Sequence, residues 1–494
     1  MKERPIEIVR TIGLGLAYLA FWPAMSMGAA PATQTKPPPA TRPSIILEAE
    51  DAEPRGTLYA TTRPGYSGSA YITGVDGEKD GLLFRAKSET GGLYQIDLRY
   101  SAPSIKGFGL TINGIGREDF FQPTGDAFAT HAGGKVELKP GDNVIELNKN
   151  WGSYDLDRIE LIPTDVAPLQ KPTAALVNPN ATPAAKALMQ TLVDGYGHGM
   201  FSGVHTRQDA KLVLDRTGRR PMVMGADLIE YTPSRVERGS NPGRRSEELI
   251  EDIKAGHIGV VMWHWNAPSG LIDKRRIEVD GKMIDASWYR GFYTEAVTFD
   301  LTAALADRDG ADYKLLLRDI DVIAVELKKF DAAGVPIIWR PLHEADGGWF
   351  WWGAKGPDAF KQLWAIVYDR ITNHHKLNNL IWMYTGTTKW DWYPPDNQFD
   401  SIGVDYYPKD QRDPVSGLWD ALQARYGQTK LLALSEIGGV PDAEAMKRLG
   451  IQWSFFYSWT DELGPRGVEP ARLKELYSSP LVKNHPGPTT QPTP

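Results

Sequence analysis

The stretch YKLLLRDIDVIAVELKKFDAAGVPIIWRPLHE, residues 313–344, joins an amphipathic helical pattern to an apolar run that ends on a carboxylate. The chain repeats this succession between residues 186 and 478. Eight strand-like runs can be counted there: MFSGVH, PMVMGADL, IGVVMWHW, VPIIWRPLHE, NLIWMYTG, SIGVDYY, LLALSEIG and WSFFYSW. Eight βα units in about 300 residues predict an α/β fold, the (β/α)8 TIM barrel. A doubly wound sheet is the alternative, but no glycine-rich phosphate loop follows the first strand.

Residues 44–164 follow a different pattern. Short alternating segments such as SIILEAE, GLLFRAK, GLYQIDLRYSA, GFGLTING and LDRIELIP recur, separated by Gly, Pro, Asn and Asp. This pattern predicts an all-β, jelly-roll-like sandwich. The segment shows no evident catalytic cluster, which favours a binding domain.

The remaining segments connect or flank these two domains. Residues 1–30 begin with basic residues, continue with TIGLGLAYLAFWPAM and end with the small residues of SMGAAPA, so they predict a signal peptide. Secretion to the extracellular space or the periplasm follows, with an uncleaved anchor as the alternative. Residues 31–43 are a Pro/Thr-rich linker, residues 165–185 a second linker, and residues 479–494 a flexible tail.

Composition narrows the possible partners and chemistry. The net charge of −7 comes without a long basic run, which argues against nucleic acid. The chain contains no cysteine, so disulfides and thiolate chemistry are excluded. The 16 Trp and 20 Tyr residues suit sugar binding, since aromatic rings stack on the C–H faces of pyranoses. A Trp-rich core is the alternative interpretation of that count.

Two glutamates end strands that face one another across the predicted barrel. Glu344 ends the fourth strand and Glu436 ends the seventh. Active sites of TIM barrels lie at the carboxyl ends of the strands. A pair of carboxylates there is what glycoside hydrolysis requires, one to protonate the leaving oxygen and one to attack or to activate water. Helix capping is the alternative role for either residue taken singly.

Four segments carry a family resemblance that covers the barrel. WRPLHEADGGWFWWG, WHWNAPSG, FYTEAVTFDL and SEIGG resemble glycoside hydrolase family 26, which consists mostly of endo-β-1,4-mannanases. The resemblance implies a retaining double displacement, with Glu344 as general acid/base and Glu436 as nucleophile. Their carboxyl groups are then expected about 5–5.5 Å apart. Burial against Trp349 is expected to raise the pKa of Glu344.

The same resemblance implies further contacts around the reacting bond. Tyr407 would donate a hydrogen bond to the nucleophile, with Tyr406 as the alternative. Asp405 would orient this group, with loop capping as the alternative role. His343 would orient the loop or Glu344. Contacts with the sugar are expected from His264, Trp263, Trp349 on the leaving-group side, and Trp459 as the stacking floor. Further candidates, for which packing roles are equally compatible, are His205, Asp227, Trp288, Phe292, Trp390 and Trp392.

The sandwich also resembles a known family. LEAEDA, GGLYQIDLRYSA, LTING and GDNVIELNKNWGSYDLDRIEL are similar to family 35 carbohydrate-binding modules. The resemblance implies a structural calcium held by Glu48, Glu50 and Asp157, for which solvated charge is the alternative. Trp151 would contact sugar, and Tyr154 is a second candidate in the same loop.

The expected function is therefore a secreted enzyme that cleaves internal β-1,4-mannosidic bonds. Its partner would be mannan or galactomannan, and it would act as a monomer without a membrane attachment after signal removal. No cofactor is expected for catalysis, because HExxH is absent and the nine His residues lack metal spacing. The alternatives are action on β-1,3-1,4-glucan or β-1,3-xylan, an exo-acting enzyme that releases mannobiose, and a non-catalytic carbohydrate-binding protein.

Overall fold

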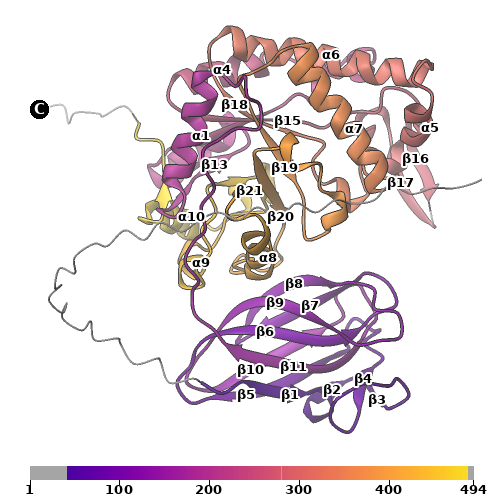
Figure 1. Ribbon diagram of the computed structural model, residues 1–494, viewed down its shortest axis with the longest axis vertical. Helices are drawn as coiled ribbons and strands as arrows, with labels where there is room; N and C mark the ends of the chain where they lie inside the picture. Colours follow the sequence, from indigo (N-terminus) through magenta and orange to yellow (C-terminus); the bar gives the residue numbers. More distant parts are fainter. Residues whose placement is uncertain (1–41, 280, 488–494) are drawn as a thin grey trace, which may run out of the picture. The chain divides into compact units, whose positions relative to one another are not determined.

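The structure is a computed structural model that describes residues 42–279 and 281–487 (Figure 1). The predicted signal peptide, nearly all of the first linker and the end of the tail lie outside the described residues. Within the described part of the chain, no helix is both long and apolar enough to cross a membrane.

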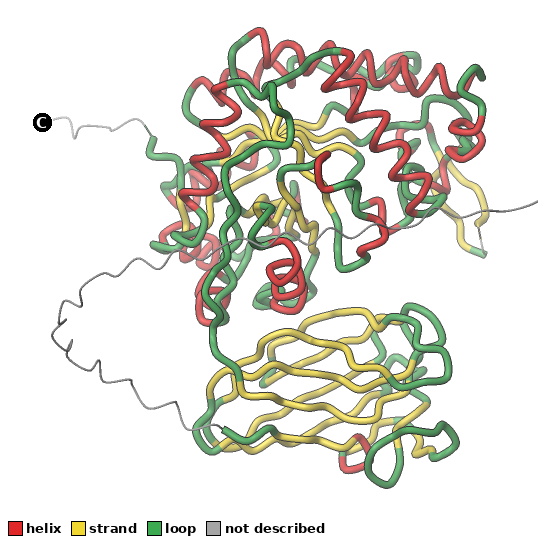
Figure 2. Tube along the Cα trace, viewed as in Figure 1, coloured by secondary structure: helices red, strands yellow, loops and turns green. Residues whose placement is uncertain are grey.

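The N-terminal domain is a sandwich of two antiparallel sheets, as predicted (Figure 2). The first sheet runs β3 (Leu58–Ala60), β4 (Tyr71–Thr73), β11 (Asp155–Pro163), β6 (Gly92–Ser101) and β9 (Ala129–Leu138), with β1 (Ile45–Glu48) beside β11. The second sheet runs β2 (Glu53–Arg55), β5 (Gly81–Ser88), β10 (Gly141–Asn148), β7 (Lys106–Ile112) and β8 (Ile115–Phe121).

Alternating burial explains why these segments form sheets. In β6, Tyr94, Ile96 and Leu98 are buried while the residues between them are half-buried. That period of two places one face of the strand on the core. The turn between β7 and β8 is Asn113-Gly114, and both residues have positive φ, as a two-residue hairpin turn requires.

The C-terminal domain is a closed barrel of eight parallel strands, which confirms the predicted fold. The strands, in barrel order, are β13 (Gly203–Val204), β14 (Val223–Asp227), β15 (Ile258–Trp263), β18 (Ile337–Pro341), β19 (Leu380–Thr385), β20 (Ser401–Tyr406), β21 (Leu431–Ile437) and β22 (Phe456–Ser458). The first predicted strand is divided, because β12 (Met200–Phe201) pairs outside the barrel with β23 (Val482–Lys483).

Helices cover the outside of the barrel (Figure 2). They are α1 (Pro183–Gly195), α2 (Arg207–Thr217), α3 (Pro233–Val236), α4 (Arg245–Lys254), α5 (Leu301–Ala306), α6 (Ala311–Ala332), α7 (Pro357–Asp369), α8 (Ser416–Tyr426), α9 (Ala443–Arg448) and α10 (Pro470–Ser478). Because α1 begins at Pro183, the first helix starts inside the predicted second linker.

Residues 313–344 show how one helix–strand unit of the barrel is built. Helix α6 buries one stripe, which includes Leu316, Ile320, Ile323 and Leu327. The chain then turns at Gly334, whose positive φ of 72° favours glycine. Strand β18 follows and is buried along its whole length, as expected of a strand covered on both faces.

A long insertion follows β15 and includes a two-stranded antiparallel hairpin. Its strands are β16 (Lys274–Val279) and β17 (Lys282–Ala286), and a short 3₁₀ helix, η3 (Trp288–Arg290), comes directly after them. The insertion thus places structured chain beside the carboxyl end of β15, where residues that line the barrel opening are found.

Candidate active site

Glu436 lies within strand β21, and both of its carboxylate oxygens accept hydrogen bonds. The hydroxyl of Tyr407 donates to Oε1 at 2.5 Å, and Nη2 of Arg340 donates to Oε2 at 2.6 Å. Two donors of this kind stabilise a negative charge on Glu436. The neighbouring Tyr406 instead donates to Asp413 at 2.6 Å.

Arg340 is a site residue that the sequence analysis missed. It is fully buried in strand β18, and its Nη1 donates to Oδ2 of Asp405 at 2.5 Å. The hydroxyl of Ser435 donates to the other oxygen of Asp405 at 2.6 Å. Arg340 therefore bridges Asp405 and Glu436, and Asp405 orients the guanidinium. Its signal was present in IIWRP, because a cation inside an apolar strand requires buried anionic partners.

Glu344 occupies a different environment from Glu436. Its backbone is left-handed, with φ of 54°, and it follows the end of β18. Burial raises the pKa of Glu344, and the negative charges of Asp405 and Glu436 raise that pKa further. The indole Nε1 of Trp349 donates to Glu344 at 2.9 Å, and this bond lowers the pKa. Burial was expected to raise the pKa, but Trp349 itself acts in the opposite direction.

The carboxyl groups converge closely. One oxygen each from Glu344, Asp405 and Glu436 lies within 4.8 Å of the others. Inverting glycosidases hold their two carboxyl groups roughly 6.5–9.5 Å apart to leave room for water, whereas retaining enzymes hold them closer. The arrangement suits direct attack by one carboxylate while the other, holding its proton, protonates the leaving group.

A hollow of about 310 Å³ lies at the carboxyl ends of β13, β14, β15 and β22, where His205, Asp227, His264 and Trp459 line it. Trp459, after β22, lies along it, and the ring of His205 stacks on Trp459 at 4.5 Å. Tyr457 fixes His205 through a hydrogen bond of 2.7 Å between its hydroxyl and Nδ1. Tyr457 fits only because residue 225 is glycine, since a Cβ there would overlap the hydroxyl. The hollow therefore has a supported aromatic surface of the kind that stacks on sugar rings.

His264 and Asp227 also line this hollow, and the ring of His264 contacts His343. Both ring nitrogens of His264 have protein partners, Asp227 at 2.6 Å and His343 at 3.0 Å. A sugar could therefore contact His264 only at the carbon edge of its ring, or at a nitrogen that also bonds to Asp227 or His343. His343 itself is buried, which agrees with an orienting position rather than a contact surface.

The structure corrects the prediction for Trp263. Its side chain is only 1% exposed, it stacks on Trp265 at 4.2 Å, and its Nε1 donates to Thr232. The prediction that Trp263 contacts substrate is wrong, because its ring is enclosed in the core of the barrel. Trp349, by contrast, is 46% exposed and free to meet a ligand.

The other aromatic candidates divide between the hollow and the packing around it. Phe292 lines the hollow and lies 5.1 Å from the ring of His264. Trp288 lies against the buried guanidinium of Arg235. Trp390 packs on Tyr393, and Trp392 packs on Phe360. The last three therefore have structural partners away from the carboxylates.

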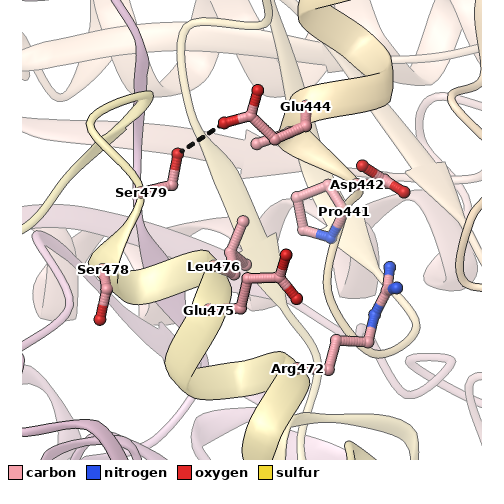
Figure 3. Close-up of a pocket in the computed structure, with 9 residues that line it drawn as sticks. Pro441, Asp442, Glu444, Arg472, Glu475, Leu476, Ser478 and Ser479 are labelled. Atoms are coloured by element: carbon pink, nitrogen blue, oxygen red, sulfur yellow. Dashed lines mark hydrogen bonds between the residues drawn. The ribbon is translucent and has the colours of Figure 1, made fainter.

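A second hollow, of about 320 Å³, lies elsewhere on the barrel between α9 and α10 (Figure 3). Asp442, Glu444, Arg472 and Glu475 line it, and the hydroxyl of Ser479 donates to Glu444 at 3.4 Å. No aromatic ring lines it. It lacks the stacking surface of the first hollow and is not a candidate sugar site.

The sandwich presents one exposed aromatic pair. Trp151 is 53% exposed and lies 5.7 Å from Phe120, which is 43% exposed. The structure corrects the prediction that Tyr154 contacts sugar, because this side chain is buried and its hydroxyl donates to the backbone oxygen of Asn148. A sugar-stacking role in this loop is therefore open to Trp151 and closed to Tyr154.

The three carboxylates predicted to hold calcium differ in their partners. Asp157 is fully buried and accepts from Arg99 and Ser67, so its charge is already compensated. Glu50 accepts three bonds on Oε1, while its Oε2 is buried without a hydrogen-bond partner. Glu48 accepts one bond from Ser67. The carboxylates of Glu48 and Glu50 are suitable ligands for calcium, which binds oxygen atoms. Asp157 is less suitable, because Arg99 and Ser67 already occupy its oxygens.

Between residues 42 and 487, leaving out residue 280, two groups of three side chains bring possible metal ligands within 4.8 Å. One is the carboxylate cluster of the site, where the guanidinium of Arg340 already supplies the positive charge. The other is Asp321, His374 and His375, where Arg370 and His375 both donate to Asp321. Neither group therefore needs a metal to satisfy its charges.

A closed TIM barrel with two facing carboxylates and a supported aromatic surface defines a glycoside hydrolase of the retaining class. Residues 177–486 match the model of Glycosyl hydrolase family 26, and residues 45–164 match that of Carbohydrate binding module (family 35). The chain belongs to glycoside hydrolase family 26 and carries a family 35 carbohydrate-binding module.

Relatives and solved structures agree with this assignment. The chain is 40% identical over 467 residues to a mannan endo-1,4-beta-mannosidase of Thermothelomyces thermophilus, with 93% of this chain and 94% of the relative covered. A crystal structure of the Podospora anserina GH26-CBM35 beta-(1,4)-mannanase matches with 41% identity, covers 89% of this chain and 97% of that one, and gives a TM-score of 0.63.

A third match is a beta-mannanase from a symbiotic protist of the termite Reticulitermes speratus, complexed with gluco-manno-oligosaccharide. It is 31% identical, covers 64% of this chain and 97% of that one, and gives a TM-score of 0.55.

Proposed function

We propose that the protein is a secreted, retaining endo-β-1,4-mannanase that acts on mannan, galactomannan or glucomannan. The observation that carries the proposal is the close pair of carboxyl groups, Glu344 and Glu436, within 4.8 Å and in unlike environments. Two relatives that are named as mannanases match nearly the whole of this chain, and their names support the choice of substrate.

The first half of the reaction uses both carboxyl groups at once. The carboxylate of Glu436 attacks C1 of the sugar as the bond to the leaving oxygen breaks, and Glu344 transfers its proton to that oxygen. The donors Arg340 and Tyr407 hold Glu436 in place for the attack. Burial keeps a proton on Glu344 beyond the pH at which an exposed glutamate loses it.

The second half returns the enzyme to its starting state. Glu344, now a carboxylate, removes a proton from water, and the resulting oxygen attacks C1 of the glycosyl-enzyme. The bond to Glu436 breaks, and the released sugar keeps the β configuration. Arg340 again stabilises the departing carboxylate through its bond to Oε2.

Two aromatic surfaces would hold the sugar rings. Trp459, supported by His205, would stack on the sugar that is attacked, and the exposed ring of Trp349 would cover the leaving-group side. The module would add a second attachment through Trp151, which raises the local concentration of polysaccharide.

Several further features belong to the same proposal. Residues 1–30 would direct secretion, the protein would act as a monomer, and catalysis would need no metal. A structural calcium in the sandwich would be held by Glu48 and Glu50, the residues whose oxygens fit one. Such an ion would stabilise the sandwich and take no part in the reaction.

The first experiment is a product analysis with the purified protein on galactomannan, glucomannan, lichenan and β-1,3-xylan. We expect a rapid fall in mannan chain length with mixed oligosaccharides and β-anomeric reducing ends at early times. Mannobiose as the sole product would mean an exo-acting enzyme. Activity only on lichenan or xylan would contradict the substrate, and inactivity on all four would favour a binding protein.

A further inference from the structure

Three polar side chains form a hydrogen-bonded row that ends at His343, the residue directly before Glu344. Asp227 in β14 bonds through Oδ2 to Nδ1 of His264 at 2.6 Å. Nε2 of His264 lies 3.0 Å from Nε2 of His343. The row therefore connects β14 to the segment that follows β18, through the residue after β15.

The protons of this row can be placed from its partners. A carboxylate only accepts, so Nδ1 of His264 carries the hydrogen that bonds to Asp227. In neutral His264 the Nε2 atom is then an acceptor, and the hydrogen between the two rings belongs to Nε2 of His343. Nδ1 of His343 is left with a lone pair, and it is the buried nitrogen of this ring without a partner.

His343 is tied to an unusual backbone. Leu342 and Glu344, the residues on either side of it, both have left-handed conformations with φ of 51° and 54°. Such conformations are unfavourable for residues other than glycine and persist only when their surroundings hold them. The backbone oxygen of His343 accepts from Nε1 of the buried Trp352 at 2.9 Å. The ring and the backbone of His343 are thus both held.

We infer that Asp227 is a positioning residue for the general acid: through His264 and His343 it holds the left-handed segment on which Glu344 enters the site. The inference rests on the proposed role of Glu344. In this role Asp227 does not touch Glu344. It fixes which nitrogen of each imidazole carries a hydrogen, and the two imidazoles in turn place Glu344 at the leaving oxygen.

The contacts of Asp227 favour this role over binding of sugar. Its Oδ1 accepts from the backbone N–H groups of Ile229 at 2.9 Å and His264 at 3.1 Å. Its Oδ2 accepts from the His264 ring. With three protein donors on two oxygens, little acceptor capacity remains for a substrate hydroxyl.

Asp227→Asn is the sharpest test, because two backbone donors fix the amide orientation. The amide oxygen takes the place of Oδ1, so the NH₂ group faces Nδ1 of His264. Nδ1 must then accept, and the hydrogen of His264 moves to Nε2. His343 must either oppose it with its own Nε2–H or move that hydrogen to its unpartnered Nδ1, so the bond between the two rings is lost or reversed in direction.

For this variant we expect kcat on mannan to fall by about 10- to 100-fold, the effect of a misplaced catalytic group. The first burst of dinitrophenolate from a dinitrophenyl β-mannobioside should remain close to that of the unchanged protein, because this leaving group needs no acid. Equal losses on both substrates, a rise in KM alone, or no loss would overturn the inference.

Controls separate positioning from stability. Asp442→Asn makes the same change in an aspartate whose Oδ1 accepts from the backbone N–H of Ala445 at the start of α9, where an amide oxygen can replace it, and should leave both activities unchanged. His343→Gln keeps an N–H near the Nε2 position and should retain more mannanase activity than His343→Leu. Equal activities of those two variants would contradict the role of the ring hydrogen.

Glu344→Ala is measured alongside. If this variant also lacks selectivity for the leaving group, the proposed role of Glu344 fails and the inference fails with it. If Glu344→Ala shows the selectivity and Asp227→Asn does not, only the positioning role is overturned.

Discussion

Glu344 and Glu436 carry the same carboxyl group at two strand ends that differ in backbone, donors and nearby charge. Glu436 lies inside a regular strand and accepts from a buried arginine and a tyrosine. Glu344 lies beyond its strand on a left-handed backbone and accepts from one indole. The first environment stabilises a charge, and the second stabilises a proton, so the surroundings divide the two tasks between identical groups.

The largest effect should come from removing the charged member of the pair. Glu436→Ala should reduce cleavage of mannan and of dinitrophenyl β-mannobioside alike, by about 10⁴-fold or more, because no nucleophile remains. Initial rates of reducing-end and phenolate release would be compared. Glu444→Ala, on α9 beside the second hollow, is the matched control and should be fully active. Ordinary activity of Glu436→Ala would refute the assignment.

Removing the proton-holding member should have a smaller and selective effect. Glu344→Ala should lower kcat/KM on mannan by about 10²–10⁴-fold, the usual contribution of a general acid. The burst of dinitrophenolate should persist, and azide should speed turnover by attacking the glycosyl-enzyme without a base. The time course of phenolate release with and without azide measures both. Loss of the burst would show that Glu344 does more than carry a proton.

A third change weakens the charged environment without removing the charge. Tyr407→Phe deletes a hydrogen bond to a carboxylate, worth about 1.5–3 kcal/mol when buried. Because Tyr407 is partly exposed, we expect kcat/KM on mannan to fall by about tenfold. Tyr406→Phe removes a hydroxyl that serves Asp413 instead and should leave kcat/KM on mannan near normal. Similar losses in both variants would mean that the effect is structural.

The smallest expected effect is a shift in pH dependence. Trp349→Phe removes the donor that favours ionised Glu344 but keeps most of the apolar cover. The pKa of Glu344 should then rise, and the alkaline limb of kcat/KM on mannan should move upward by about half a pH unit. Full pH profiles of both proteins provide the measurement. A downward shift would mean that solvent entry outweighs the lost hydrogen bond.

The strand ends could be predicted from sequence because they depend on periodic patterns. Apolar runs of β18 and β21 locate Glu344 and Glu436 without any side-chain coordinates. The same pattern could not test the sugar contact that the family resemblance implied for Trp263, since a run buried on both faces does not show which side chains reach the opening. Burial on both faces of a barrel strand thus removes the information that alternation supplies elsewhere.

The electrostatic environment was not predictable in the same way. Arg340, Asp405 and Glu436 come from three strands, and their pairing depends on barrel register rather than on local sequence. The left-handed backbone at Glu344 has no propensity signal either, because surrounding contacts impose it on a residue that does not favour it. A sequence pattern describes one strand at a time, so it does not predict contacts that depend on how several strands are aligned.

Gly225 has a practical consequence for engineering. Replacing glycine with alanine is a common route to a more heat-resistant enzyme, since it restricts the unfolded chain. At position 225 a methyl group would displace the hydroxyl of Tyr457, and with it His205 and the indole of Trp459. The overlap should therefore lower the melting temperature as well as displace the aromatic surface that would stack on sugar, and this position should be kept out of such libraries.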